Sequence, residues 1–343
     1  MCAVPGATRI SRRSFLIMTA ALAACKPEAE LLKFSGPAMG TTYNVAAVDH
    51  EGDADRAALD LAIRAALAEV DQVMSNWNPA SEISRVNARA WGEAIPLSPE
   101  LAHVMAGASA VHRASEGRFD VTAGPLIDLW GFGADGGAPR VPDDDAIAAA
   151  MARSGQDRVL SLEDGALRKT TPGPEIYLAA IGKGYGVDRV AAALRGFGLG
   201  DFMVEIGGDL YAAGDNASGA PWRIGIESPA PAARDLQKIV GLSGLGMATS
   251  GDYRNFFEAD GAHYSHIIDP MTGRPITHST VSATVLTEDA MMADAWATAM
   301  LVLGSERGLA IAEKQELAVY FIDRDDDSQF SATASSRFSR LEA

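Results

Sequence analysis

Cysteine and positive charge are both scarce in this sequence. The 343 residues include two cysteines, Cys2 and Cys25, so the rest of the chain can hold neither an internal disulfide nor a cysteine-based zinc site. Lysine and arginine number 29 against 45 aspartates and glutamates, which gives a formal net charge of -16. A field of that sign repels phosphate backbones, so we expect no nucleic-acid partner. An anionic small ligand would need a local cation or a metal ion.

The apolar run near the N-terminus is too short to span a bilayer. From Phe15 to Ala24 it would rise only about 15 Å as a helix, against a hydrocarbon core of roughly 30 Å. It follows the pair Arg12 and Arg13 and ends in small residues. This order is typical of a twin-arginine secretory signal.

The end of this run is similar to a lipobox, the cleavage site of bacterial lipoproteins. The sequence Leu22-Ala23-Ala24-Cys25 predicts cleavage before Cys25 and a lipid anchor on that residue. An ordinary cleavage site beside a chance cysteine is the alternative. We expect a signal peptide over 1–24, a tether over 25–33 and one domain over 34–343. The protein is then expected in the periplasm, lipid-anchored to a membrane, with the inner membrane favoured.

Apolar patterning predicts strands and helices that interleave without a regular strand–helix repeat. This order favours an α+β fold over a doubly wound parallel sheet. The expected strands are two pieces around a turn within 34–48, then 158–162, 167–170, 175–181, 202–206, 210–213, 222–226, 239–242 and 318–322. The expected helices are 53–75, 99–115, a short one after 143–145, 186–195 and 288–303.

One expected helix is apolar on every face and carries an aspartate. It has Thr287 as its cap and Gly304 as its stop, and it surrounds Asp294 with apolar side chains. An unpaired carboxylate is costly in such a place. Thr298 lies one turn further on the same face, and two oxygens of this kind suit a hard divalent cation such as Mg²⁺. A buried Asp paired with Lys or Arg, with the Thr bonded back to the helix, is the alternative.

A lysine stands among glycines where a strand is expected to meet a helix. Residues 181–187 read IGKGYGV, and glycines beside a helix N-terminus and Lys183 favour an anion. Gly184 stands where a P-loop needs Ser or Thr, and Val187 stands where a dinucleotide fingerprint needs glycine. The segment is therefore either an anion site of no standard type or a plain strand–turn–helix corner.

Other polar and aromatic residues are candidates for lining a cleft. His266 precedes a turn sequence, DPMTG, and is a candidate general base, phosphate contact or structural histidine. Ser250 lacks the Gly-x-Ser-x-Gly setting because Ala248 stands in it, so a serine hydrolase is discounted. Met39 and Trp77 either stack on a flat heteroaromatic ligand or pack in the core.

Together these segments resemble the ApbE family, the FAD:protein FMN transferases. The matching blocks follow the family's order along nearly the whole chain after the tether. They are 36–41 (GPAMGT), 74–77 (MSNW), 81–87 (SEISRVN), 119–125, 129–133, 181–184, 206–209, 264–275 and 293–298.

The resemblance implies a T-fold-related α+β fold of two lobes, with FAD in the cleft between them. It implies Mg²⁺ held by the Ala180 carbonyl, Asp294 and Thr298. The residues that the resemblance places on FAD are Met39, Trp77, Phe119, Asp120, Tyr177, Lys183 and Ile268. Tyr177 stands where the family usually has aspartate.

The implied reaction is Mg²⁺-dependent transfer of FMN from FAD to a Thr or Ser hydroxyl of an acceptor flavoprotein, with AMP leaving. The implied acceptor is a subunit of a membrane redox complex. His266 matches a histidine implicated in transfer, and Lys183 and Asp294 complete the expected catalytic set. An FAD pyrophosphatase that yields FMN and AMP, or a flavin-binding lipoprotein without catalysis, is the alternative.

Overall fold

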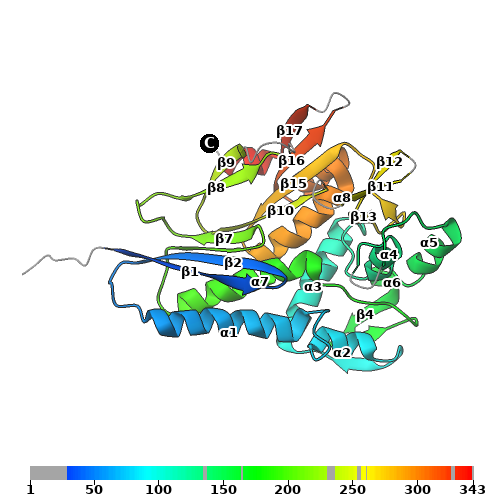
Figure 1. Ribbon diagram of the computed structural model, residues 1–343, viewed down its shortest axis with the longest axis horizontal. Helices are drawn as coiled ribbons and strands as arrows, with labels where there is room; N and C mark the ends of the chain where they lie inside the picture. The colour runs from blue at the N-terminus through cyan, green and yellow to red at the C-terminus, as the bar shows by residue number, and fades with distance from the viewer. Residues whose placement is uncertain are drawn as a thin grey trace, which may run out of the picture.

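Eight strands form one antiparallel sheet, called the main sheet below, within the residues that the structure describes. The computed structural model describes residues 29–341, apart from 134–136, 164, 230–235, 253–255, 260 and 326–328. The strands follow the order β1-β2-β6-β7-β10-β15-β16-β17 across the sheet (Figure 1). Their bounds are β1 Glu30–Ala38, β2 Thr41–Asp49, β6 Phe202–Ile206, β7 Asp209–Ala213, β10 Leu245–Gly251, β15 Thr280–Thr287, β16 Ala318–Arg324 and β17 Phe330–Ala334.

Both faces of the main sheet are covered. Helices α1 (Arg56–Met74), α7 (Ala179–Gly196) and α8 (Ala290–Lys314) pack on one face and on one another. The hairpin of β8 (Trp222–Glu227) and β9 (Leu236–Leu242) shares a second core with the other face, together with α9 (Ser336–Leu341). Alternate residues of one strand therefore enter two separate cores, as the pleat requires.

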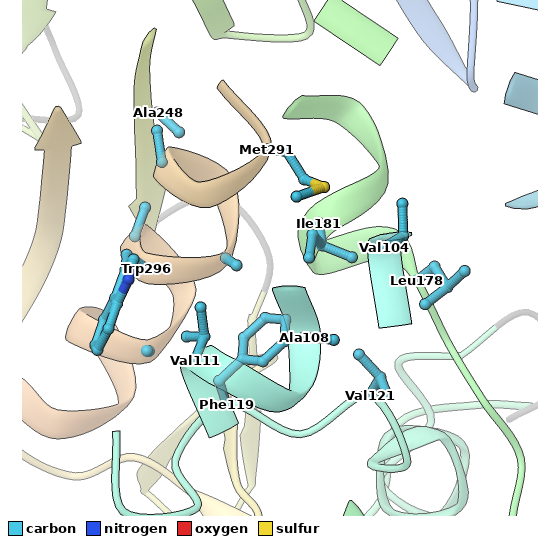
Figure 2. Close-up of a cluster of buried hydrophobic side chains, with 14 of the residues drawn as sticks. Val104, Ala108, Val111, Phe119, Val121, Leu178, Ile181, Ala248, Met291 and Trp296 are labelled. Carbon is cyan, nitrogen blue, oxygen red and sulfur yellow. The ribbon is translucent and has the colours of Figure 1, made fainter. Parts of the chain in front are cut away.

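The remaining elements form a smaller lobe beside α7 and α8 (Figure 1). Its helices are α2 Glu82–Ala88, α3 Pro99–Ala114, α4 Gly124–Leu129, α5 Asp144–Met151 and α6 Gln156–Val159. Its strands are β3 Ala94–Pro96, β4 Leu160–Glu163, β5 Ala166–Lys169, β11 Phe256–Ala259, β12 Ala262–Ser265, β13 Ile268–Asp269 and β14 Arg274–Pro275. Figure 2 shows the core that joins the lobes, where Val111 and Phe119 meet Ile181 of α7 and Trp296 of α8.

The α+β expectation is confirmed, as are most of the expected elements. The N-terminal hairpin is β1–β2, with its turn at Met39 and Gly40. The helix expected over 53–75 is α1, and the Asp55 side chain caps it by accepting from two backbone amides at 3.0 Å. Strand β1 already begins at Glu30, so the last four residues of the expected tether pair with β2.

The strand expected over 175–181 is wrong. The chain has no regular strand there, and α7 begins at Ala179, seven residues before the expected helix start at Gly186. The glycines that favoured a corner lie inside the helix. Gly184 and Gly186 are buried there, so their lack of a side chain serves helix packing and not a phosphate-binding loop.

The sequence patterns also missed two central strands, β10 and β15, and the second half of α8. Strand β15 is buried at all eight positions, so it has no apolar–polar alternation to detect. At Gly304 the backbone leaves the helical conformation, with φ 74° and ψ 168°, so the first helical stretch of α8 ends where expected, and a second stretch continues after this kink to Lys314. Asp289, not Thr287, provides the cap, by accepting from the Met292 amide at 2.7 Å. Across the described residues, no helix is both long and apolar enough to cross a bilayer.

Close contact between α7 and α8 depends on Gly184. A Cβ placed there would lie 2.1 Å from the carbonyl oxygen of Ala290 and 2.7 Å from Cα of Met291. These are backbone atoms, so a side chain at position 184 forces the two helices apart.

We therefore expect Gly184→Ala to destabilise the fold by about 1–3 kcal/mol or more, as overpacked cores do. Gly196→Ala is the matched control, because it lies in the same helix and a Cβ placed there would meet nothing within 4 Å. At Gly196 the ordinary preference of a helix for alanine should give up to about 1 kcal/mol of stabilisation. Urea unfolding of wild type, Gly184→Ala and Gly196→Ala measures both changes in the free energy of unfolding. Equal effects of the two substitutions would contradict the packing argument.

Candidate active site

One large cleft lies where the main sheet, α7 and α8 face the smaller lobe. Its volume is about 760 Å³, within the range of pockets that hold cofactor-sized ligands. It is lined by parts of β2, β8, β10 and α8, by the start of α7, and by the segments 118–127, 205–210 and 266–270. Elements from both lobes therefore contribute to it, as the two-lobed expectation requires.

Three charged side chains form a group beside this cleft, which Lys183 and Asp294 line and behind which Asp209 is buried. Lys183 Nζ donates a hydrogen bond to Asp209 Oδ2 and lies 3.6 Å from Asp294 Oδ1. The two carboxylate side chains are 3% and 5% exposed, whereas Lys183 is 32% exposed. We call these three residues the Lys–Asp–Asp group. It contains two carboxyl groups and one ammonium group.

Charge and burial together shift the pKa values in this group. Burial alone would lower the pKa of Lys183, but the carboxylates of Asp294 and Asp209 outweigh it and raise that pKa. Burial, reinforced by the charge of Asp294, raises the pKa of Asp209 to about 7, although Lys183 opposes the shift. Lys183 therefore remains an ammonium group at neutral pH.

Asp294 is also tied to the first turns of α7. In a regular helix the amide of Gly184 bonds the carbonyl of Ala180, four residues earlier. In this protein that amide donates to Oδ2 of Asp294 at 3.0 Å. Asp294 and Ala180 both line the cleft. The close approach at Gly184 is what makes this bond between helices possible.

Hydroxyl groups extend the polar wall along α8 and β10. Thr298 lies one turn after Asp294, and its Oγ1 is 3.3 Å from Oγ of Ser250. Asp294, Thr298 and Ser250 all line the cleft. Thr298 is therefore turned toward a neighbouring hydroxyl in the cleft wall, and both parts of the expected metal pair lie on the face of α8 that borders the cleft.

The N-terminus of α7 opens into the same space. Leu178 at its start provides no side-chain cap, and Ala179 and Ala180 line the cleft. Uncapped amides at a helix N-terminus, with Lys183 one turn away, favour a bound anion. The strand–turn–helix geometry expected for this segment is wrong because its glycines are helical, and anion binding at this helix N-terminus stays a prediction.

The structure brings most of the predicted site residues to the cleft. Those that line it are Phe119, Asp120, Ala180, Lys183, His266, Ile268, Asp294 and Thr298. Met39, Trp77 and Tyr177 are not among its lining residues. Met39 packs on α7 beside Gly182 and Gly186.

Trp77 and Tyr177 have different surroundings. Trp77 is 68% exposed, in the segment that connects α1 to α2. The Tyr177 amide donates to the Val121 carbonyl at 2.7 Å, and its ring lies against Gly124. Tyr177, which stands where an aspartate is expected, thus packs against the start of α4.

Two of the lining residues have structural partners that their sequence positions did not reveal. Phe119 is 1% exposed and belongs to the core between the lobes (Figure 2). The carboxylate of Asp120 accepts from the Thr122 amide at 2.7 Å and from the Gln156 amide at 2.9 Å. These bonds hold the 119–123 segment at the edge of the cleft.

His266 lies between β12 and β13 and borders the cleft. It is half-buried, and its ring meets Phe132 edge-on at 6.2 Å between centroids. The turn that follows is fixed by the Gly273 amide, which donates to the Asp269 carbonyl at 2.8 Å. An imidazole in this position can exchange a proton with a ligand in the cleft.

Asp209 is the site residue that the sequence did not assign. The sequence does show that Asp209 follows a Gly-Gly pair and opens an expected strand. No local pattern, however, pairs this aspartate with a lysine 26 positions earlier. Among the described residues, no three His, Cys, Asp or Glu side chains form a group able to hold a metal ion. A metal site would therefore need hydroxyl or backbone oxygens as well.

Comparisons with known proteins agree with the fold. The model of the ApbE family matches residues 39–321. The chain belongs to this family.

Several named relatives cover nearly the whole chain. A Vibrio cholerae protein named FAD:protein FMN transferase is 43% identical over 329 residues, which are 95% of this chain and 98% of that one. A Haemophilus influenzae protein of the same name is 39% identical over 330 residues, covering 94% and 95%.

Solved structures give the same result. The flavin transferase ApbE from Vibrio cholerae matches with a TM-score of 0.84 and 42% identity, covering 91% of this chain and 99% of that one. The apo form of the Pseudomonas stutzeri flavinyl transferase ApbE has a TM-score of 0.84 and 38% identity, covering 92% and 97%. The expectation of an ApbE-like fold is confirmed.

A half-buried aspartate outside the cleft positions the helix that carries Asp294. The Asp188 carboxylate of α7 accepts from the amides of Ala290 and Met291, each at 2.9 Å, at the start of α8. Burial raises the pKa of Asp188 to about 7, although these two bonds oppose the shift. In the unfolded chain the same group has a pKa near 3.8.

This shift predicts how stability depends on pH. Between pH 4 and 7 the unfolded chain has lost the Asp188 proton while the folded chain keeps it, so the contribution of Asp188 falls as pH rises, by up to about 1.4 kcal/mol per unit. Asp188→Asn removes this slope. The free energy of unfolding of wild type, minus that of Asp188→Asn, should decrease from pH 4.5 to 7.5 in urea titrations. The exposed Asp145→Asn variant should show a flat difference. A flat or rising difference for Asp188→Asn would contradict the assignment.

Proposed function

We propose that this protein transfers FMN from FAD to a Ser or Thr hydroxyl of an acceptor flavoprotein. The acceptor oxygen attacks the phosphorus on the FMN side of the pyrophosphate, the bond to the AMP phosphate breaks, and AMP leaves. FMN stays on the acceptor through a phosphoester. The observation that supports this most directly is the Lys–Asp–Asp group in a cleft between two lobes. It occurs in a chain 43% identical to a named FAD:protein FMN transferase.

The donor set in the cleft fits Mg²⁺. The Ala180 carbonyl, the Asp294 carboxylate and the Thr298 hydroxyl are oxygen donors, which a hard cation prefers, and all three residues line the cleft. The Asp294 carboxylate adds negative charge at the cleft wall, which favours a cation there. Asp294 Oδ1 has Lys183 at 3.6 Å, longer than a hydrogen bond. When bound, Mg²⁺ would neutralise phosphate charge as a Lewis acid.

The protein's own groups have separate roles in the proposal. The Lys183 ammonium and the uncapped N-terminus of α7 bind the phosphates and orient the pyrophosphate. His266 accepts the proton of the attacking hydroxyl. Ile268, which is 6% exposed, provides an apolar wall for the flavin. Phosphate binding and proton transfer thus come from opposite lobes, so both lobes are needed for turnover.

Other expectations remain part of the proposal on the strength of family resemblance. Met39, Trp77 and Tyr177 are proposed to contact FAD, together with Phe119 and Asp120. The twin-arginine signal, cleavage before Cys25 and its lipid anchor lie outside the described residues. We propose export to the periplasm with attachment to the inner membrane, where an acceptor subunit of a membrane redox complex would be reached.

Intact-mass spectrometry tests the transfer directly. Protein, FAD, Mg²⁺ and an acceptor flavoprotein with a reactive Ser or Thr should give the acceptor plus one FMN phosphoester, and one AMP per FMN attached. AMP and free FMN without acceptor modification would identify a pyrophosphatase. Bound flavin with no AMP would identify a binding protein. Asp294→Asn should lower transfer by about a hundredfold or more, as losses of key electrostatic contacts do. Glu306→Gln, which removes an exposed charge from the same helix, should not change it.

His266 should act in the transfer step and not in FAD binding. In the same assay His266→Ala should reduce the rate by about 10²–10⁴-fold, the usual contribution of a general base. The FAD dissociation constant, measured by flavin fluorescence, should change little. His263→Ala is the control, since His263 is exposed on β12, where its ring lies tilted against Phe256 with 4.4 Å between centroids. Equal transfer rates for His266→Ala and wild type would remove His266 from the mechanism.

A further inference from the structure

Asp209 lies deeper in the cleft wall than the lysine it binds. It is the first residue of β7 and follows Gly207 and Gly208, which have φ values of 57° and 100°. Residues with side chains adopt such angles rarely, so the turn is suited to glycine. The strand pairing of Asp209 with Ile206 then fixes its backbone in the main sheet. The carboxylate is therefore held by a rigid element.

Asp209 determines where the Lys183 ammonium lies. Nζ of Lys183 is hydrogen-bonded to Asp209, but it is 3.6 Å from Asp294 Oδ1. Lys183 and Asp294 are on helices that touch at Gly184, so the flexible lysine side chain could otherwise close on Asp294. A partly buried ammonium is stabilised by a carboxylate partner. Asp209 supplies it from the sheet side.

We propose that Asp209 is a positioning residue that keeps Lys183 at 3.6 Å from Asp294 Oδ1 and out of hydrogen-bond contact with it, so that this oxygen remains available to a divalent cation. This inference rests on the proposed function for the identity of that cation. Without Asp209, Lys183 pairs directly with Asp294 and competes with the metal for the same oxygen. The role of Asp209 is thus to divide two functions between two neighbouring groups: phosphate binding by the ammonium and cation binding by the carboxylate.

A crystal structure of Asp209→Asn without divalent ions tests the positioning directly. We expect Nζ of Lys183 within hydrogen-bond distance of Asp294 Oδ1, in place of the present 3.6 Å. Asp209→Glu keeps the charge and should keep Lys183 away from Asp294. An unmoved lysine in Asp209→Asn would overturn the proposal, and this arm requires neither metal nor activity. Thermal melts of both variants confirm folding.

Mn²⁺ binding, followed by electron paramagnetic resonance, tests the consequence. Asp209→Asn should weaken Mn²⁺ affinity by about tenfold or more when Lys183 is present, since a close ammonium opposes the cation. In the Lys183→Met background the same substitution should have a much smaller effect. Equal weakening in both backgrounds would mean that Asp209 acts through its charge alone, and would overturn the positioning role.

The two failures are distinguishable. If wild type binds no Mn²⁺, with or without FAD, the metal part of the proposed function fails, and the need to separate Lys183 from Asp294 fails with it. If wild type binds Mn²⁺ and transfers FMN while Asp209→Asn binds Mn²⁺ equally well, only the inference about Asp209 fails.

Discussion

The contact between α7 and α8 at Gly184 is the constraint on which the site depends. Because position 184 has no side chain, its amide reaches the Asp294 carboxylate at 3.0 Å. That approach brings Lys183, one residue earlier, beside the same carboxylate. The main sheet then adds Asp209 from the other side. The close packing of α7 on α8 at Gly184 therefore also determines how the charged side chains of the site are arranged.

Much of the site could be predicted from sequence because its residues occur in short, distinctive local patterns. An aspartate in an entirely apolar helix must find a partner, and of the two interpretations of Asp294 the ion pair is confirmed while the metal site stays a prediction. In the structure it lies beside Lys183, as one alternative held, while its neighbours provide the oxygen set that the other required. Local spacing could not distinguish an ion pair from a metal site at Asp294, because the surroundings of Asp294 include α7, which is over a hundred residues away in the chain.

What could not be predicted was decided by tertiary contacts. Strand β15 is buried throughout and shows no alternation, so only its place between β10 and β16 identifies it as a strand. Residues 175–181 contain strand-forming types, but packing against α8 draws the second part of this segment into a helix. The role of Asp209 could not be predicted, because its partner Lys183 lies on α7. The packing of α7 on the main sheet brings the two together, and no spacing within β7 indicates it.

The two outer strands of the main sheet also have a consequence for how copies of the molecule meet. Within the described residues, β1 and β17 each pair on one side alone. Strand β1 presents exposed Lys33 and Pro37 along its length, and proline has no amide hydrogen to donate. Charge and a missing donor discourage a further strand from joining that edge. The sheet is thereby protected against growth into open-ended aggregates from this side.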